Sequence, residues 1–224
     1  KQIIFAALLL AQLGLCCDTS IAQSTKLVPQ VQVPQVRFRV SGKAAFLLEP
    51  PAASEHWQET PGKVAKPWVW YAPTLRDRYP GPEEAWMIRR FHDQGIAVAG
   101  IDVGESYGSP AGTKHFQQFY EELTQRRGYA KKCVLLARSR GGLMLYNWAV
   151  EHPDCVAAIA GIYPVCNIAS YPGVDRAAAA YEMTPAQLRS TLSVHNPIDR
   201  LADLAAHKVP ILHIHGEPDR VVPL

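Results

Sequence analysis

The sequence carries little net charge, and it lacks the motifs and repeats of several large classes of protein. Its 224 residues include 23 Lys and Arg against 20 Asp and Glu, so the formal net charge is only +3. Such a small and scattered charge argues against a nucleic-acid-binding surface. A phosphate-binding glycine loop and internal repeats are both absent from the sequence. With 48% hydrophobic residues, the chain is long and apolar enough to form one packed domain.

An apolar run long enough to span a membrane is also missing. The longest run follows Lys1 and gives way to small residues up to Ala22. It is too short for a stable membrane span, and its basic start is typical of a secretory signal peptide. We therefore expect residues 1–22 to be removed and the protein to be exported, to the periplasm or as a secreted protein. A lipoprotein signal at Cys16 is the alternative, although bulky Leu15 stands where a small residue is wanted.

Cysteine is scarce. Of the five cysteines, Cys133, Cys155 and Cys166 lie beyond the expected signal peptide. Cys133 and Cys155 open two strands that we expect to be neighbours, so they could form a disulfide in an exported protein. Free buried cysteines fit the sequence equally well. An odd number leaves at least one thiol unpaired.

The rest of the chain alternates apolar runs with helical patterns. Residues 23–35 are polar and proline-spaced, as in an extended linker, and residues 36–224 are expected to form one domain. The alternation indicates an α/β fold with a doubly wound, mostly parallel sheet that begins with an antiparallel hairpin at its edge. Residues 163–206 interrupt the rhythm, and we expect a small cap-like insertion over the strand ends there. The expected strands are residues 37–40, 44–48, 68–71, 96–103, 134–137, 156–162 and 209–214, with helices over 82–94, 116–123 and 143–151.

One stretch has the pattern of a nucleophile elbow. An apolar run leads into Ser139, and two glycines follow before a helical pattern begins. A strand, a sharp turn and a helix present a serine hydroxyl at the tip of the turn, where the nearby positions must be small. Gly141 meets that requirement, and Ala137 stands where glycine is usual. The N–H of Arg140 would face the oxygen of a substrate carbonyl at the start of the helix.

A second stretch, residues 209–223, reads as another buried strand that ends in a Gly/Pro turn. Asp219 stands just past the strand end, and Glu217 is the fallback acid; an acid in such a turn could also simply cap backbone N–H groups. Serine first and acid second is the order used by α/β-hydrolases. Together the two stretches resemble that superfamily, and more closely its prolyl-oligopeptidase-like and dienelactone-hydrolase-like esterases, over roughly residues 36–224. The resemblance implies Ser139 as nucleophile and Asp219 as catalytic acid.

The resemblance also implies a histidine base after the acid, and the sequence has none there. All eight histidines precede Asp219. We therefore expect the chain to be a truncated fragment, inactive by itself, that ends before its catalytic histidine; His195 is the alternative base. His213 and His215 share one face of a strand, as metal ligands can, but no third ligand is evident, so we expect them to be buried strand histidines. Neither a metal nor a cofactor is expected.

The second donor of an oxyanion hole should come from the loop after strand 68–71. Pro73 has no N–H, so Thr74 or Ala72 must donate. The hydroxyl of Tyr71 could assist; this would resemble the use of a tyrosine in the prolyl-oligopeptidase group. The alternative is that Tyr71 is only part of the core.

Two arginines, Arg138 and Arg140, bracket Ser139. The position of Arg140 is similar to that in glucuronoyl esterases, where an arginine directly follows the serine. A guanidinium fixed beside the nucleophile would favour a substrate that bears a carboxylate. In the alternative interpretation both arginines are structural, paired with Glu105 or Asp102.

These features predict an exported serine hydrolase that forms an acyl-enzyme on Ser139 and acts on a small-molecule carboxylic ester. A serine peptidase of the prolyl-oligopeptidase type remains open, although repeats that would build a peptide-filtering propeller are not visible. A non-catalytic binding protein on a hydrolase scaffold also remains open.

Overall fold

The computed structural model describes residues 35–51, 65–75, 80–216 and 222. The predicted signal peptide and all but the last residue of the predicted linker lie outside these residues, as do Asp219 and Glu217. Gln35, placed in the linker by the sequence, is the first residue of a strand. The strands are β1 (Gln35–Val40), β2 (Lys43–Leu48), β3 (Trp68–Ala72), β4 (Ala97–Ile101), β5 (Cys133–Arg138), β6 (Val156–Ile162) and β7 (Ile211–Ile214).

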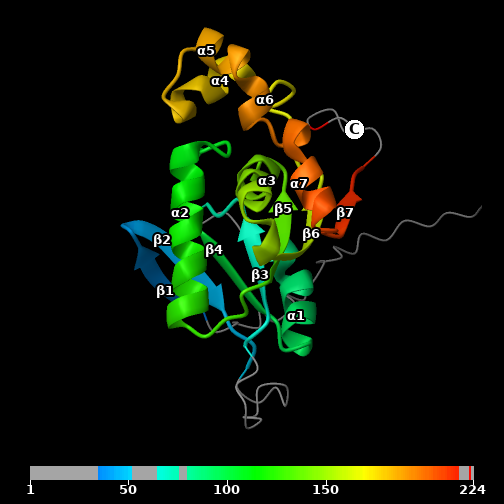
Figure 1. Cartoon of the computed structure of the whole chain (residues 1–224). Helices are drawn as coiled ribbons and strands as arrows, with labels where there is room; N and C mark the ends of the chain where they lie inside the picture. Colours follow the sequence, from blue (N-terminus) through cyan, green and yellow to red (C-terminus); the bar gives the residue numbers. More distant parts are fainter. Residues whose placement is uncertain (1–34, 52–64, 76–79, 217–221, 223–224) are drawn as a thin grey trace, which may run out of the picture. The chain divides into compact units, whose positions relative to one another are not determined.

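The seven strands form a single sheet in the order β1-β2-β4-β3-β5-β6-β7 (Figure 1). β1 and β2 form an antiparallel hairpin at one edge, and β2 also runs antiparallel to β4. All the other pairs are parallel. The predicted doubly wound, mostly parallel sheet with an antiparallel edge hairpin is therefore confirmed. Because its parallel strands end at the same edge, residues that follow β3, β5 and β6 gather there.

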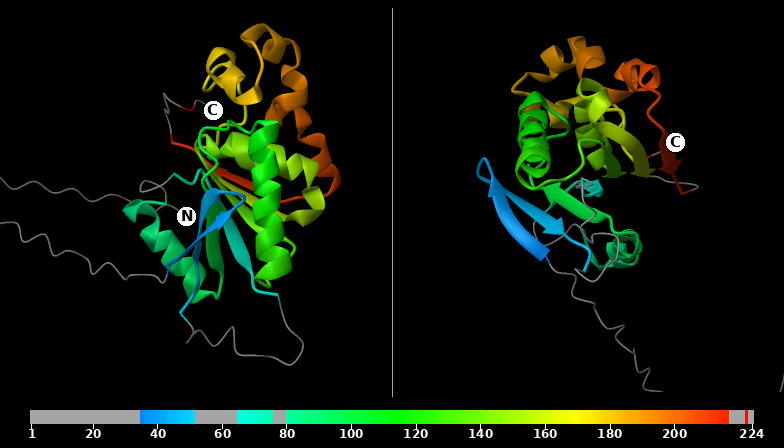
Figure 2. Two further views of the ribbon diagram at one scale, coloured as in Figure 1. Left: turned by 90° about the vertical axis from the view of Figure 1, so that its left-hand side faces the viewer. Right: turned by 60° about the horizontal axis from the view of Figure 1, so that its bottom comes forward.

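Helices cover both faces of the sheet (Figures 1 and 2). On one face, α2 and α3 bury a core rich in aromatic residues, in which the rings of Trp70 and Trp148 lie 4.7 Å apart. On the other face, α1 packs through Ile88 against β3 and β4. The longer helices are η2 with α1 (Pro82–Glu84 and Ala85–Asp93), α2 with the π-helical turn η3 (Pro110–Glu121 and Glu122–Arg126), and α3 (Gly141–Glu151).

Between β6 and β7 the chain forms short helices instead of another strand and long helix. Thr184 caps one of them with a reciprocal side-chain bond to Gln187, as the Thr-Pro signal in the sequence suggests. Part of this segment forms a small apolar cluster with Leu143 of α3, to which Val165 and Tyr181 belong. The short helices of this segment are α4 (Val174–Ala177), η5 (Ala178–Tyr181), α5 (Pro185–Ser190), α6 (Leu192–His195), η6 (Pro197–Arg200) and α7 (Ala202–Ala206); a further short helix, η4 (Pro153–Cys155), lies between α3 and β6.

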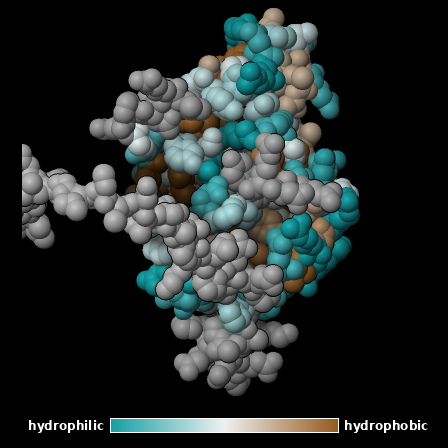
Figure 3. Space-filling model, turned by 180° about the vertical axis from the view of Figure 1, so that it is seen from behind, coloured by the Kyte–Doolittle hydropathy of each residue, from teal (hydrophilic) through white to brown (hydrophobic). Residues whose placement is uncertain are grey.

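The prediction that the strand before Asp219 is buried is wrong for its described residues. β7 lies at an edge of the sheet, where only β6 pairs with it, and Leu212 and Ile214 are 64% and 62% exposed. Seen from behind, where β7 lies to the left, apolar surface gathers on that side (Figure 3). A continuous apolar run indicates a strand, but it does not say whether both faces of that strand are covered.

Cys133, Cys155 and Cys166 are all free, and the thiol of Cys133 donates to the carbonyl oxygen of Cys155, so the free-thiol alternative holds in this structure. No described helix is both long and apolar enough to cross a membrane.

Candidate active site

Ser139 lies at a sharp turn between β5 and α3. Its φ of +50° falls in the left-handed region, which residues other than glycine seldom adopt. The turn is held by backbone bonds: the Ser139 N–H donates to Ile162 O at 3.0 Å, and its carbonyl oxygen accepts from the N–H groups of Gly142 and Val165 at 2.9 and 2.8 Å. Ser139 is half-buried, and its hydroxyl makes no hydrogen bond with any residue in the described part of the chain. This is the geometry that the elbow pattern predicts.

The glycines of the elbow are required by close backbone contacts. A Cβ on Gly141 would lie 2.0 Å from Ala72 O, and one on Gly142 would lie 2.3 Å from Val165 O. Ala137, in contrast, is fully buried and pairs in register with Ala72 of β3 and Gly161 of β6. A methyl group is therefore accommodated at the position where glycine is usual.

The start of α3 offers a place for negative charge. Within the described residues, the N–H of Arg140 has no backbone acceptor, whereas the N–H groups of Ser139 and Gly142 are both bonded. The helix dipole adds a partial positive charge at the same end. The contact of Gly141 with Ala72 and Pro73 brings the loop after β3 against this helix end. The structure thus brings together the two segments from which an oxyanion hole would be built.

Thr74 lies in this loop but turns its side chain toward the sheet. It is buried, its hydroxyl is 3.4 Å from Tyr71 O, and its oxygen would collide with a Cβ on Gly100 of β4. A role for its N–H in an oxyanion hole stays a prediction.

The structure places the Tyr71 and Arg138 side chains away from the candidate oxyanion site. Tyr71 is 1% exposed, and its hydroxyl donates to Glu84 Oε1 at 2.7 Å. Arg138 is paired with the same carboxylate and with Glu83, and its Nε donates to the hydroxyl of Tyr163 at 2.9 Å. Burial, opposed by Arg138 and reinforced by Glu84, raises the pKa of Tyr71, so its phenol stays protonated. Both side chains belong to a structural network, which is the alternative that the sequence left open for each of them; a contact of either with substrate stays a prediction.

Glu84, the centre of that network, was not identified from the sequence as a site residue. The Pro-Glu-Glu stretch is what the first turn of a helix normally contains, and exposed acids are common there. Only the tertiary structure shows that one of the two acids is 5% exposed and turned toward β3 and β5.

Arg140 forms an ion pair with one of the two acids, Glu105 and Asp102, that the sequence offered as partners. Its Nη2 lies 3.0 Å from Glu105 Oε1, with side-chain exposures of 23% for Arg140 and 43% for Glu105. Its Nε is buried and has no hydrogen-bond partner among the residues that the structure describes. The guanidinium beside the serine is thus partly neutralised but keeps one unused donor.

None of the described histidines is hydrogen-bonded to the hydroxyl of Ser139. The ring of His195 packs against Tyr181 at 5.1 Å, and its backbone oxygen accepts from Asn147, about two turns along α3 from the elbow. Burial lowers the pKa of His195, and nearby Arg200 lowers it further, whereas Glu151 opposes the shift. The inactivity of residues 1–224, expected from the sequence, stays a prediction.

The two strand histidines are not the buried residues that we expected. His213 is exposed as a residue, although its Nε2 lies 2.6 Å from the hydroxyl of Tyr146, and His215 is half-buried. Among the described residues, no group of three or more His, Cys, Asp or Glu side chains is arranged to hold a metal ion. The acid of the predicted triad, Asp219, lies outside the described residues.

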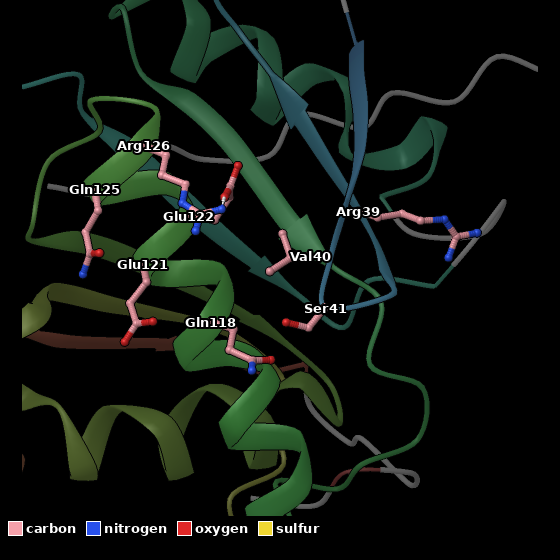
Figure 4. A pocket seen from close by; sticks show the side chains of 8 residues that line it. All are labelled: Arg39, Val40, Ser41, Gln118, Glu121, Glu122, Gln125 and Arg126. Atoms are coloured by element: carbon pink, nitrogen blue, oxygen red, sulfur yellow. Dashed lines mark hydrogen bonds and ion pairs between the residues drawn. The ribbon is translucent and has the colours of Figure 1, made fainter.

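A cavity of about 220 Å³ lies elsewhere, between the β1–β2 turn and the end of α2. Its walls are mostly polar: Gln118 faces Ser41 across it, and Arg126 pairs with Glu122 at 3.2 Å (Figure 4). β1 is at the opposite edge of the sheet from β7, and none of the cavity's lining residues belongs to the elbow. We therefore assign the candidate active site to the elbow and not to this cavity.

Comparisons with known proteins show what this chain is similar to. The family model of the serine aminopeptidases (S33) matches residues 84–201. No curated protein matches the chain in sequence. Among solved structures, an S-formylglutathione hydrolase from Agrobacterium tumefaciens shares 15% identity with a TM-score of 0.62, covering 84% of this chain and 76% of that one. A lipase/esterase from Lactobacillus plantarum shares 16% identity with a TM-score of 0.54, covering 83% and 92%.

A puromycin-hydrolyzing peptidase from Mycobacterium tuberculosis is similar over a smaller part of its length. It shares 14% identity with a TM-score of 0.59, and the match covers 84% of this chain but 32% of the peptidase. At these identities the structural likenesses show the fold alone.

Proposed function

The chain belongs to the serine aminopeptidase (S33) family of α/β-hydrolases, and from this premise we propose that it is a carboxylic-ester hydrolase acting through an acyl-enzyme on Ser139. The observation that carries the proposal is the elbow. Ser139 combines a left-handed backbone with a hydroxyl that no described residue binds, at the carboxyl end of β5. In open α/β sheets, ligands bind at this end of the strands.

The chemistry follows from the geometry of the turn. The Ser139 hydroxyl attacks the ester carbonyl, and the developing oxyanion lies near the N–H of Arg140 at the start of α3. An N–H that is unbonded before the reaction can bind the oxyanion without first breaking another bond. In this proposal Asp219 orients the base, a histidine takes the serine proton and returns it to the leaving alcohol, and water then hydrolyses the acyl-enzyme.

The segment between β6 and β7 is assigned a supporting role. Its apolar cluster packs on Leu143 in the first turn of α3, next to the elbow, so it is placed to form one wall of the substrate pocket. Export through the N-terminal signal and a small-molecule ester as the substrate remain parts of the proposal.

A peptidase is the second candidate, favoured by the family to which residues 84–201 match. The two candidates differ in the bond that is cleaved. We propose to compare an aminoacyl ester with the amide of the same acyl group, in the full-length protein and in Ser139→Ala. Turnover of the ester without turnover of the amide, abolished in Ser139→Ala and kept in the control Ser170→Ala, supports the esterase; Ser170 is an exposed serine whose hydroxyl bonds Asn167 O.

Turnover of the amide that depends on Ser139 would replace the esterase by the peptidase, because serine peptidases cleave esters as well as amides. If Ser139→Ala keeps full activity on both substrates, the nucleophile lies elsewhere. If neither substrate is turned over, the binding-protein alternative gains support.

A further inference from the structure

A buried carboxylate lies beneath the elbow. Glu84, directly before α1, is 5% exposed. Its Oε1 accepts from the hydroxyl of Tyr71 at 2.7 Å and is paired with Arg138, and its Oε2 accepts from the N–H of Gly81 at 2.7 Å. Burying a charge is costly unless it is paired and hydrogen-bonded, and here both carboxylate oxygens are engaged.

The partners of Glu84 sit at the ends of the strands that surround the nucleophile. Tyr71 is the last but one residue of β3, next to the loop expected to supply an oxyanion donor. Arg138 is the last residue of β5 and directly precedes Ser139. Through its Nε, Arg138 also binds the hydroxyl of Tyr163, the first residue after β6. One carboxylate therefore connects, directly or through Arg138, the ends of three neighbouring strands.

The elbow needs such support because its backbone is strained. Residues held in the left-handed region persist only where their surroundings fix them. Both Ser139, with φ +50°, and Tyr163, with φ +38°, are held in this region. The backbone bonds from Ser139 to Ile162 and Val165 join the same two segments that the Arg138–Tyr163 bond joins by side chains.

We propose that Glu84 is a positioning residue for the nucleophile: it fixes Arg138, and through it the Ser139 turn, against the ends of β3 and β6. This inference rests on the proposed function, since it assigns Glu84 a role in the reaction of Ser139. Glu84 acts from beneath the turn, through Arg138 and Tyr71.

The chain supplies a matched control in the neighbouring acid. Glu83 also pairs with Arg138, at 3.1 Å, but its side chain is 54% exposed. Among the hydrogen bonds of the described residues, those to Tyr71 and Gly81 are made by Glu84 and not by Glu83. Glu83→Gln therefore removes one carboxylate near Arg138 while leaving the buried junction intact, and Glu84→Gln keeps the size of the side chain but removes the charge from that junction.

The experiment measures both the kinetics and the local stability of the elbow in the same variants. In the full-length protein, Glu84→Gln should lower kcat for ester hydrolysis by between about ten- and a hundredfold, with KM changed less than about twofold, because a small displacement of the nucleophile acts on the chemical step. Glu83→Gln should stay within about twofold of the wild type in both constants. Amide hydrogen exchange at Ser139, Gly142 and Val165 should be at least about tenfold faster in Glu84→Gln than in Glu83→Gln.

Several outcomes would overturn the proposal. One is a Glu84→Gln protein that melts at a lower temperature but keeps wild-type kcat and elbow exchange, because Glu84 would then be only structural. Another is an equal effect of the two substitutions. If Glu84→Gln does not fold, Tyr71→Phe removes one donor from the same carboxylate and should shift kcat and exchange in the same direction; no shift would contradict the proposal.

Failure of the proposed function gives a different result. If the wild type shows no turnover that depends on Ser139, the esterase proposal fails, and the exchange comparison alone decides whether Glu84 holds the turn. Unchanged exchange in Glu84→Gln would then overturn the positioning role as well.

Discussion

Replacing Gly141 by alanine should destabilise the protein through a steric conflict at the elbow. The added Cβ would lie 2.0 Å from Ala72 O and 2.6 Å from Pro73 N, whereas real Cβ atoms essentially never come closer than 3.0 Å. The opposing atoms belong to the backbone at the end of β3, so no side-chain rotation can relieve the contact. The strand end or the start of α3 must move by about 1 Å, the difference between 2.0 and 3.0 Å, in a closely packed interior.

Overpacking of this kind costs about 1–3 kcal/mol. For a domain of this size, each kcal/mol lowers Tm by roughly 2–4 °C, so Gly141→Ala should melt about 2–12 °C below the wild type. Gly216→Ala is the matched control, because a Cβ there would meet no heavy atom within 4 Å and its φ is not left-handed. Thermal unfolding followed by circular dichroism measures both variants. Equal Tm values for Gly141→Ala and Gly216→Ala would refute the elbow geometry.

Two further predictions concern charge. Because Glu105 partly neutralises Arg140, Glu105→Gln should raise the kcat/KM ratio of the methyl ester of a sugar acid to a neutral ester of similar size by about two- to fivefold; an unchanged ratio would mean that Arg140 does not meet the substrate. Burial lowers the pKa of His92 from the ordinary value of 6.5, and the bond of its ring to Leu48 O opposes this shift. Its stabilising contribution is therefore complete above pH 6.5 and is lost as the pH falls through the lowered pKa. His92→Gln should consequently flatten the fall of Tm between about pH 7 and pH 5, and a fall as steep as that of the wild type would contradict this account.

The fold was largely predictable because its signals are local. Apolar runs such as Trp68–Ala72 form strands buried on both faces, and glycines with left-handed φ, such as Gly95 and Gly128, end the helices where the sequence suggests. The elbow was predictable for the same reason, since the turn at Ser139 imposes small residues at fixed positions along the chain.

The errors came from tertiary relationships that periodicity does not encode. β7 has the composition of a buried strand, yet its exposure depends on its place at the edge of the described sheet. Tyr71 and Arg138 were assigned to the substrate because they flank the expected site, but in a strand successive side chains point to opposite faces. Both turn to the face covered by α1, where Glu84 binds them.

The pairing of Arg140 shows the limit of what residue type alone can predict about an ion pair. The sequence offered Glu105 and Asp102 as partners, both in the segment after β4, and the structure joins Arg140 to Glu105. No pattern in the sequence separates the two acids, because the choice depends on how the chain turns at Gly104, whose φ is +70°.

The central claim is that Ser139 is a reactive nucleophile, and covalent labelling tests it most directly. The full-length protein would be treated with a fluorophosphonate probe, and the modified residue located by mass spectrometry of proteolytic peptides, with Ser139→Ala alongside. The account predicts a single phosphonylated residue, Ser139, and loss of labelling in Ser139→Ala. Labelling at another serine, or equal labelling of Ser139→Ala, would contradict it.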